Sequence, residues 1–340
     1  MKLNRFCILL AVFLIASAGL VAEGSSEKKF PVQPINVSVG GSAGGSADLT
    51  ARIVAALMEK ELGQRIIVSD LPGGSGGTAS NEVLSKPHDG HYWLANANPQ
   101  MSASVLGATD KTMKDWEIFL VAGTTGILSV REDSPYNTVE ELFAAMKKTP
   151  GRIKWSAGPP GTPWQVQASL LAKWAGIEFN FVPYQGSNPS IIGCLNGEAD
   201  AVLTGLSEQA EFLGAGKLKP LAVTEPQAME VPKYGKVRSI LEVVPEFKNI
   251  SPQVRQFNFF AVPADVNKET VAIINTAFKK IMASQQMKDY CSKNYMFAIN
   301  KSLDEAKKEV LEQEKVFTWI LFDLGIATRS PADLGIARPQ

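Results

Sequence analysis

Two glycine-rich loops could bind a small anion through their backbone N–H groups. The first, Gly40 to Asp48, follows the apolar stretch 35–39, and the second, Gly158 to Pro163, follows the stretch 152–156. Each loop precedes a predicted helix, whose start carries unpaired N–H donors and the positive end of the helix dipole. Neither loop contains Lys or Arg. This pattern predicts a site that holds a small anion and argues against phosphate chemistry.

We expect the ligand contacts to come from small, hydroxyl, amide and aromatic residues at these loops and strand ends. They are Ser42, Ala43, Gly44, Gly45, Ser46, Asp48, Asn98, Gly158, Gly161, Thr162, Trp164 and Ser187. Some of them also have purely structural interpretations. The glycines can simply permit a tight turn, Asp48 can balance the helix dipole, Trp164 can pack at a helix start, and Ser187 can cap a helix.

The expected donors are neutral. They are the backbone N–H groups around 44–46 and 161–162, the hydroxyls of Ser42 and Thr162, and bridging water. The basic residue nearest to the first loop is Arg52, one helical turn into the following helix. We expect Arg52 to pair on the helix surface, so the ligand charge would be held without an ion pair.

Other kinds of chemistry find little support in the sequence. Residues 74–79 match the spacing Gly-x-Gly-x-x-Ala of a dinucleotide fingerprint, but the acidic residue expected after the next strand is absent. The only histidines, His88 and His91, flank a turn without a nearby Cys, which is a weak pattern for zinc. No Gly-x-Ser-x-Gly elbow is present. We therefore expect no catalytic residue, cofactor or metal.

The N-terminus has the pattern of a secretory signal. Lys2 and Arg5 precede an apolar run from Phe6 to Ala22, and small residues follow. We predict cleavage by residue 24 and a periplasmic mature protein; an uncleaved membrane anchor is the alternative. Cleavage would leave 32 basic and 33 acidic residues, so charge gives no reason to expect nucleic acid or a membrane surface as a partner.

Strands and helices alternate along the mature chain, which predicts an α/β fold. The series from 35 to 96 reads βαβαβ and predicts a mainly parallel sheet. A second alternating series follows a glycine-rich break near 123, and residues 225–256 are polar and irregular. The remaining two cysteines, Cys194 and Cys291, are far apart in sequence and are expected to be buried thiols.

These interruptions predict two lobes and two crossings between them. After the signal segment 1–24, lobe 1 would combine 30–123 with 257–340, and lobe 2 would comprise 124–256. Ligands of such folds bind outside the carboxyl ends of parallel strands, where both glycine loops lie. Facing lobes joined by two linkers also suit hinge closure on a ligand.

Several motifs occur in an order that resembles the Bug family, the extracytoplasmic solute receptors of tripartite tricarboxylate transporters. The matching stretches are 39–48, 70–77, 89–94, 156–162, 182–187, 195–200, 215–218 and 222–224. The resemblance implies a two-lobed periplasmic binding fold of the type II-like, Venus flytrap kind, with parallel-rich sheets and an interlobe cleft. It also implies a small organic carboxylate as ligand and the membrane subunits of such a transporter as partners.

The chain departs from the family pattern in both loops. Gly40-Gly41 stands where Pro-Phe is usual, so an apolar wall of the cleft is expected to be missing. In the second loop, Pro159, Pro160 and Pro163 remove three N–H donors. These departures bear on the identity of the ligand, which the sequence does not specify.

The sequence thus predicts an exported, monomeric solute-binding protein that captures a small organic carboxylate and delivers it to a transporter. Two alternatives remain open at this point. One is an exported α/β enzyme acting on a carboxylate or ester, which would need a histidine in the cleft with a perturbed pKa. The other is a receptor that binds the same ligand but signals through a sensor.

Overall fold

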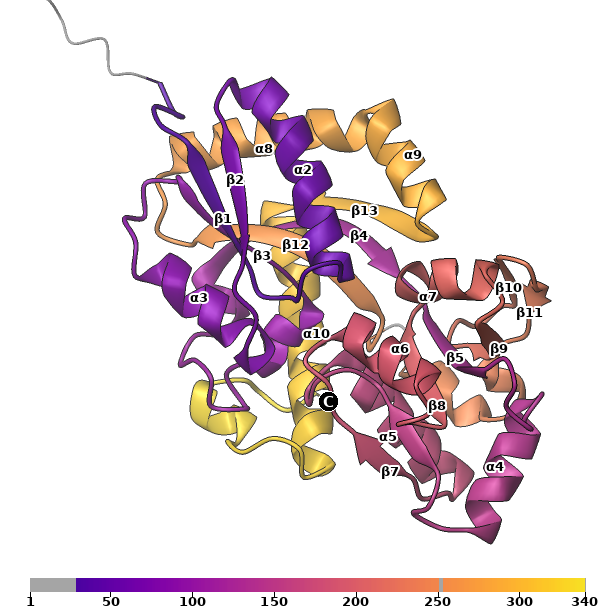
Figure 1. Ribbon diagram of the computed structural model, residues 1–340. Helices are drawn as coiled ribbons and strands as arrows, with labels where there is room; N and C mark the ends of the chain where they lie inside the picture. Colours follow the sequence, from indigo (N-terminus) through magenta and orange to yellow (C-terminus); the bar gives the residue numbers. More distant parts are fainter. Residues whose placement is uncertain (1–28, 251–252, 340) are drawn as a thin grey trace, which may run out of the picture.

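The computed structural model describes residues 29–250 and 253–339, which form two mixed β-sheets covered by helices (Figure 1). The predicted signal segment 1–24 lies outside the described residues. Among the helices in this part of the chain, none combines the length and the apolar character that a membrane crossing requires. The two sheets with their helices are called lobe 1 and lobe 2 below.

Lobe 1 is built on a six-stranded sheet with the order β13-β4-β12-β3-β1-β2. Its strands are β1 (Ile35–Val39), β2 (Ile66–Asp70), β3 (Tyr92–Ala97), β4 (Trp116–Thr124), β12 (Gln256–Pro263) and β13 (Met296–Ser302). Its helices are α2 (Ser46–Leu62), α3 (Gly77–Leu84), α8 (Lys268–Ala283), α9 (Gln285–Lys293) and α10 (Leu303–Asp323). Strands β1, β2 and β3 pair in parallel, as the βαβαβ pattern predicts, whereas β12, β4 and β13 add antiparallel pairings.

Lobe 2 is built on a five-stranded sheet with the order β7-β6-β8-β5-β9. Its strands are β5 (Gly126–Arg131), β6 (Lys154–Ser156), β7 (Asn180–Val182), β8 (Ala201–Gly205) and β9 (Leu218–Val223). Its helices are α4 (Val139–Lys148), α5 (Pro163–Ala175), α6 (Ser187–Leu195) and α7 (Leu206–Gly214). The β6–β7 and β6–β8 pairings are parallel, and those of β5 with β8 and β9 are antiparallel.

The chain passes from the first sheet to the second between β4 and β5, and it returns between β9 and β12. The returning segment contains a short hairpin of β10 (Met229–Val231) and β11 (Gly235–Val237), which the sequence pattern did not predict. We propose that these two crossings mark the limits of the lobes, with 30–123 plus 257–340 forming lobe 1.

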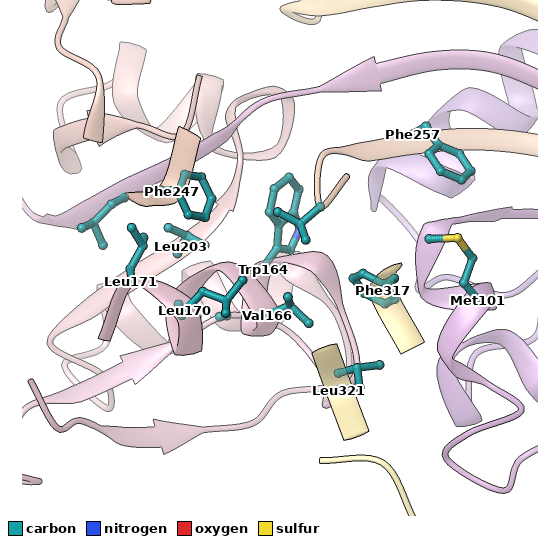
Figure 2. Packing of buried hydrophobic residues seen from close by; sticks show 14 of the residues in the cluster. Met101, Trp164, Val166, Leu170, Leu171, Leu203, Phe247, Phe257, Phe317 and Leu321 are labelled. Atoms are coloured by element: carbon teal, nitrogen blue, oxygen red, sulfur yellow. The ribbon is translucent and has the colours of Figure 1, made fainter. Parts of the chain in front are cut away.

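An apolar cluster joins the lobes on one side. It contains Leu94 and Ile118 from the sheet of lobe 1, Leu203 from the sheet of lobe 2, and side chains of α5 and α10. Figure 2 shows Phe317 of α10 between Val166 of α5 and Met101, all of them buried. The two sheets therefore share one apolar core at this junction, and each lobe has a further apolar cluster of its own.

Candidate functional site

A cavity of about 330 Å³ lies between the two lobes. Lobe 1 contributes the loop ahead of α2, the turn 72–75 and the end of β3. Lobe 2 contributes the loops ahead of α5 and α6 together with Glu208 of α7. The starts of three helices thus surround one cavity, as the position of the glycine loops predicts.

Two hydrogen bonds connect the lobes beside the cavity. The hydroxyl of Ser42 donates to the carbonyl oxygen of Gln185. The hydroxyl of Ser75 donates to the carbonyl oxygen of Pro160 at 3.1 Å. All four residues line the cavity, so the described conformation has its lobes in contact across the site.

The structure places half of the predicted contact residues on the cavity wall. Those that line it are Ser42, Gly45, Ser46, Thr162, Trp164 and Ser187. The predicted residues that lie outside the lining are Ala43, Gly44, Asp48, Asn98, Gly158 and Gly161. The second group comes from the same loops and, for Asn98, from the end of β3, so the sequence predicted the region of the cavity more accurately than its individual lining residues.

The first glycine loop presents the start of α2 to the cavity. The N–H of Gly45, the residue ahead of α2, donates to the Ser42 carbonyl oxygen at 3.0 Å. The next N–H groups, of Ser46 and Ala47, begin the helix and have no partner within it. Both residues line the cavity, so the helix-start N–H groups on the lining belong to the last residue of the expected range 44–46 and to the residue that follows it.

Asp48 takes the structural role that the sequence left open. One of its carboxylate oxygens accepts a hydrogen bond from the Gly44 N–H at 2.8 Å, and the other lies 2.6 Å from Nε of Arg52. Arg52 also bonds Asp70 at 3.0 Å. Burial and the neighbouring Asp48 charge raise the pKa of Asp70. This acidic pair shares one guanidinium on the surface of α2, away from the cavity lining.

Asn98 is also held away from the cavity. Its side chain is fully buried, and its amide donates to the Arg255 carbonyl oxygen at 3.0 Å. Asn96 lines the cavity instead, with its amide bonded to Gln100 Oε1 at 3.0 Å and to the Ser75 carbonyl oxygen at 3.4 Å. Both asparagines belong to one Ala-Asn-Ala-Asn stretch at the end of β3, so the sequence alone did not distinguish them.

The donors expected from the second loop are already used within lobe 2. The Gly158 N–H donates to Ser190 Oγ at 2.9 Å, and the Gly161 N–H donates to Gln165 Oε1 at 2.7 Å. The Thr162 hydroxyl is within hydrogen-bond distance of two carbonyl oxygens of its own loop. The Gly161 N–H and the Thr162 hydroxyl, both expected to donate to ligand, therefore have partners within their own lobe in this structure.

This loop instead forms an apolar wall. Pro159, Pro160 and Trp164 line the cavity, and Pro72 and Leu106 line it from lobe 1. Trp164 is 1% exposed and belongs to the apolar cluster at the lobe junction, so it packs and lines the cavity at once. The wall expected to be missing because of Gly40-Gly41 is thus supplied by other residues.

Glu208 is the ionisable cavity residue that sequence reasoning missed. Its carboxylate accepts a hydrogen bond from the Gly205 N–H at 2.8 Å, at the start of α7. Burial raises its pKa, while hydrogen bonds from the Gly205 N–H, the Ser187 hydroxyl and Ser46 act in the opposite direction. An acidic residue in a first helical turn usually balances the dipole, so its sequence position gives no sign of a role in a cavity.

The residues considered for catalysis and metal binding lie elsewhere. His88 pairs with Asp265 at 2.6 Å, and Nε2 of the buried His91 accepts a hydrogen bond from the Val32 N–H at 3.2 Å. Neither histidine lines the cavity. The described residues contain no group of three or more His, Cys, Asp and Glu side chains that could hold a metal ion. Both described cysteines are buried free thiols, as expected.

Comparison with curated proteins shows full-length and partial relatives. A UPF0065 protein in the gbd 5′ region of Cupriavidus necator is 28% identical over 338 residues, which cover 95% of this chain and 97% of that protein. A UPF0065 protein in the tcbD-tcbE intergenic region of Pseudomonas sp. (strain P51) is 29% identical over 210 residues. That match covers 60% of this chain and 62%, less than two thirds, of the relative.

Solved structures share the fold. R. palustris Rpa4515 with adipate superposes with a TM-score of 0.78 at 21% identity, covering 88% of this chain and 99% of that one. MatC (Rpa3494) from Rhodopseudomonas palustris with bound malate gives a TM-score of 0.75 at 20% identity, covering 86% and 100%. These likenesses support the predicted two-lobed α/β fold of periplasmic binding proteins.

The family comparison agrees with the motif order, the two lobes and the cavity at the helix starts. The model of the Tripartite tricarboxylate transporter family receptor, TctC, matches residues 50–325, which is most of the chain. The resemblance to the Bug receptors is thereby confirmed, and this protein belongs to the TctC family of tripartite tricarboxylate transporter receptors.

Proposed function

We propose that this protein is an extracytoplasmic receptor that binds a small organic carboxylate between its lobes. The observation that carries the proposal is the interlobe cavity, about 330 Å³ in volume, onto which the start of α2 opens. Helix-start N–H groups offer donors and a positive dipole end to a carboxylate, without requiring Lys or Arg. Membership of the receptor family supports the same function.

The hydrogen-bond donors in the proposed site are neutral. Ser46 and Ala47 offer N–H groups at the start of α2, and Ser187 stands at the start of α6. Hydrogen bonds to an ionised acceptor contribute roughly 1.5–3 kcal/mol each, so a few of them give useful affinity. Adipate and malate, the molecules named with two structural neighbours, are carboxylates, which supports this ligand class.

The loaded protein would act outside the cytoplasm and as a monomer. Segment 1–24 would direct export, and the closed form would dock on the membrane subunits of a tripartite tricarboxylate transporter. This part of the proposal rests on the family membership and on the sequence pattern of the N-terminus. Loss of uptake of the bound carboxylate on deletion of the gene, with restoration by the full chain, tests it.

Binding is tested directly by calorimetry with the mature chain and a panel of mono-, di- and tricarboxylates and amino acids. Gly45→Val serves as the variant, because a Cβ at Gly45 would lie 3.0 Å from the Ser42 carbonyl oxygen and place a side chain on the cavity wall. Gly214→Val is the control, since this exposed glycine has only Pro232 nearby, at 3.7 Å.

We expect at least one panel member to bind the wild type and Gly214→Val, and Gly45→Val to lose it. Binding should proceed without turnover of the compound, which chromatography of the mixture after incubation would verify. A folded wild-type protein that binds no carboxylate of the panel would contradict the proposal, and so would a Gly45→Val protein with unchanged affinity.

A further inference from the structure

The cavity wall carries a single ionisable side chain, and that side chain is acidic. Among the described residues that line the cavity, only Glu208 ionises; the others are glycine, apolar, hydroxyl or amide residues. Glu208 is half-buried, and its carboxylate bonds the Gly205 N–H at 2.8 Å. A receptor for an anion thus exposes a carboxylate to its ligand and no basic side chain.

This arrangement penalises a ligand that carries only negative charge. Like charges placed close together in a poorly solvated space repel strongly, and burial weakens the screening that water would provide. With a dicarboxylate bound, three carboxylates would share a cavity whose walls include Pro72, Leu106 and Trp164. The guanidinium of Arg52 is engaged by Asp48 and Asp70 outside the lining.

Hydrogen-bond donors from both lobes surround the Glu208 carboxylate. The Gly205 N–H, the Ser187 hydroxyl and Ser46 all lie within its hydrogen-bonding environment. Ser46 and Ser187 are themselves at the starts of α2 and α6, from the two lobes. Glu208 therefore lies beside the helix starts proposed to hold the ligand carboxylate, so a second charged group on the same small ligand would lie close to it.

We propose that Glu208 is a specificity-determining residue that pairs with a cationic group of the ligand, so that the site takes a zwitterionic carboxylate such as an amino acid. The inference rests on the proposed carboxylate-binding function and narrows its ligand class. The carboxylate of the zwitterion meets the N–H groups at the start of α2, and its ammonium group meets Glu208. The apolar wall of Pro159, Pro160 and Leu106 then faces the uncharged part of the ligand.

The test compares pairs of compounds that differ only by the ammonium group. Aspartate with succinate, glutamate with glutarate, alanine with propionate, and leucine with 4-methylpentanoate are titrated into the mature protein by calorimetry at pH 7.5. At least one amino acid should bind at least tenfold more tightly than its partner lacking the ammonium group. A charge-assisted hydrogen bond that only the amino acid can make gives this ratio.

The variant is Glu208→Gln, and Glu211→Gln is its matched control. Glutamine keeps an oxygen that can accept from the Gly205 N–H, so the start of α7 is retained. Glu211 lies on the same helix but is exposed and outside the lining. Glu208→Gln should bind the amino acid at least tenfold more weakly and its partner at least as well as the wild type does. Glu211→Gln should keep the wild-type ratio.

Three results would overturn the inference while leaving carboxylate binding intact. The first is wild-type protein that binds succinate, glutarate or a monocarboxylate more tightly than every amino acid of the set. The second is unchanged discrimination in Glu208→Gln. Titrations in two buffers of different ionisation enthalpy would reveal a proton taken up with a dicarboxylate, which also overturns it.

The remaining outcomes are equally decisive. If none of these compounds binds, the inference fails, and the wider carboxylate panel described above decides the proposed function separately. If Glu208→Gln does not fold, as judged by its thermal unfolding, the ratio measured for wild-type protein decides alone.

Discussion

At the scale of single residues, glycines let the backbone close tightly around the polar side chains beside the proposed site. A Cβ at Gly40 would lie 2.4 Å from Nδ2 of Asn96, and one at Gly76 would lie 1.9 Å from the same atom. Both glycines therefore allow β1 and the turn before α3 to close around Asn96. Asn96 in turn bonds Gln100 and fixes the end of β3 at the cavity.

Arg52 offers a test of whether the ligand charge is held without an ion pair. We expect Arg52→Ala to weaken carboxylate binding by less than tenfold, because the guanidinium contacts Asp48 and Asp70 and does not line the cavity. Calorimetry with the best-binding panel compound measures the change. Complete loss of binding in a protein that remains folded would show that a cation holds the ligand charge.

The buried Glu314 should make the stability of the folded protein depend on pH. It is 3% exposed, burial raises its pKa to about 7, and it accepts a hydrogen bond from the Met113 N–H at 2.9 Å. The folded state therefore holds the proton of the Glu314 carboxyl group more tightly than the unfolded state does. As the pH rises from about 4.5 to 7, Glu314 thus lowers the free energy of unfolding. The loss is on the order of 3 kcal/mol across that interval.

We expect Glu314→Gln to remove this loss. Urea unfolding at pH 5 and pH 8 should show a smaller fall in free energy of unfolding for the variant than for the wild type. Glu312→Gln, on the same helix but exposed and paired with Lys315 at 2.5 Å, should keep the wild-type dependence. Equal pH dependence in Glu314→Gln and wild type would contradict the assignment.

At the scale of elements, periodicity predicted most strands and helices but not the antiparallel edge of lobe 1. The parallel strands are apolar runs followed by helices, which leave a clear pattern along the chain. Strand β13 leaves none, because left-handed backbone at Asn300 and a register shift between Ala298 and Lys301 interrupt its alternation. Its pairing depends on β4, which is distant in sequence, so local pattern could not reveal it.

The same limit applies to the site. The loops ahead of α2 and α5 were predictable from glycine, proline and the following helix. Glu208 was not, because only the contact between lobes brings a first-turn carboxylate of α7 beside Ser46. The hydrogen bonds that the Gly158 and Gly161 N–H groups donate within lobe 2 could not be predicted either, because their acceptors are side-chain oxygens that no loop pattern specifies.

The loop elements that bridge the lobes should hold the closed state. Ser75→Ala removes the hydrogen bond to the Pro160 carbonyl oxygen, which exists only while the lobes are in contact. We expect affinity to fall about two- to tenfold, mainly through faster dissociation of the best-binding compound in stopped-flow measurements. In the control Ser85→Ala, whose hydroxyl bonds the nearby Glu82 carbonyl oxygen, the dissociation rate should not change.

At the scale of the whole molecule, ligand binding should change the relative position of the lobes. Contacts from both lobes to one ligand form only when the cleft is shut, so the ligand shifts the population toward the closed form. Small-angle scattering should give a smaller radius of gyration for saturated than for ligand-free protein. An unchanged radius with binding proven by calorimetry would argue against hinge closure.

The apolar cluster that joins the lobes has a consequence for cooperativity. Met101, Val166 and Phe317 are buried together although they come from different parts of the fold, so neither lobe can melt without exposing apolar surface of the other. Calorimetry should therefore show a single unfolding transition with equal calorimetric and van't Hoff enthalpies. Phe317→Ala should lower the stability of that one transition by about 3–5 kcal/mol. Two resolved transitions in the wild type would mean that the lobes melt independently.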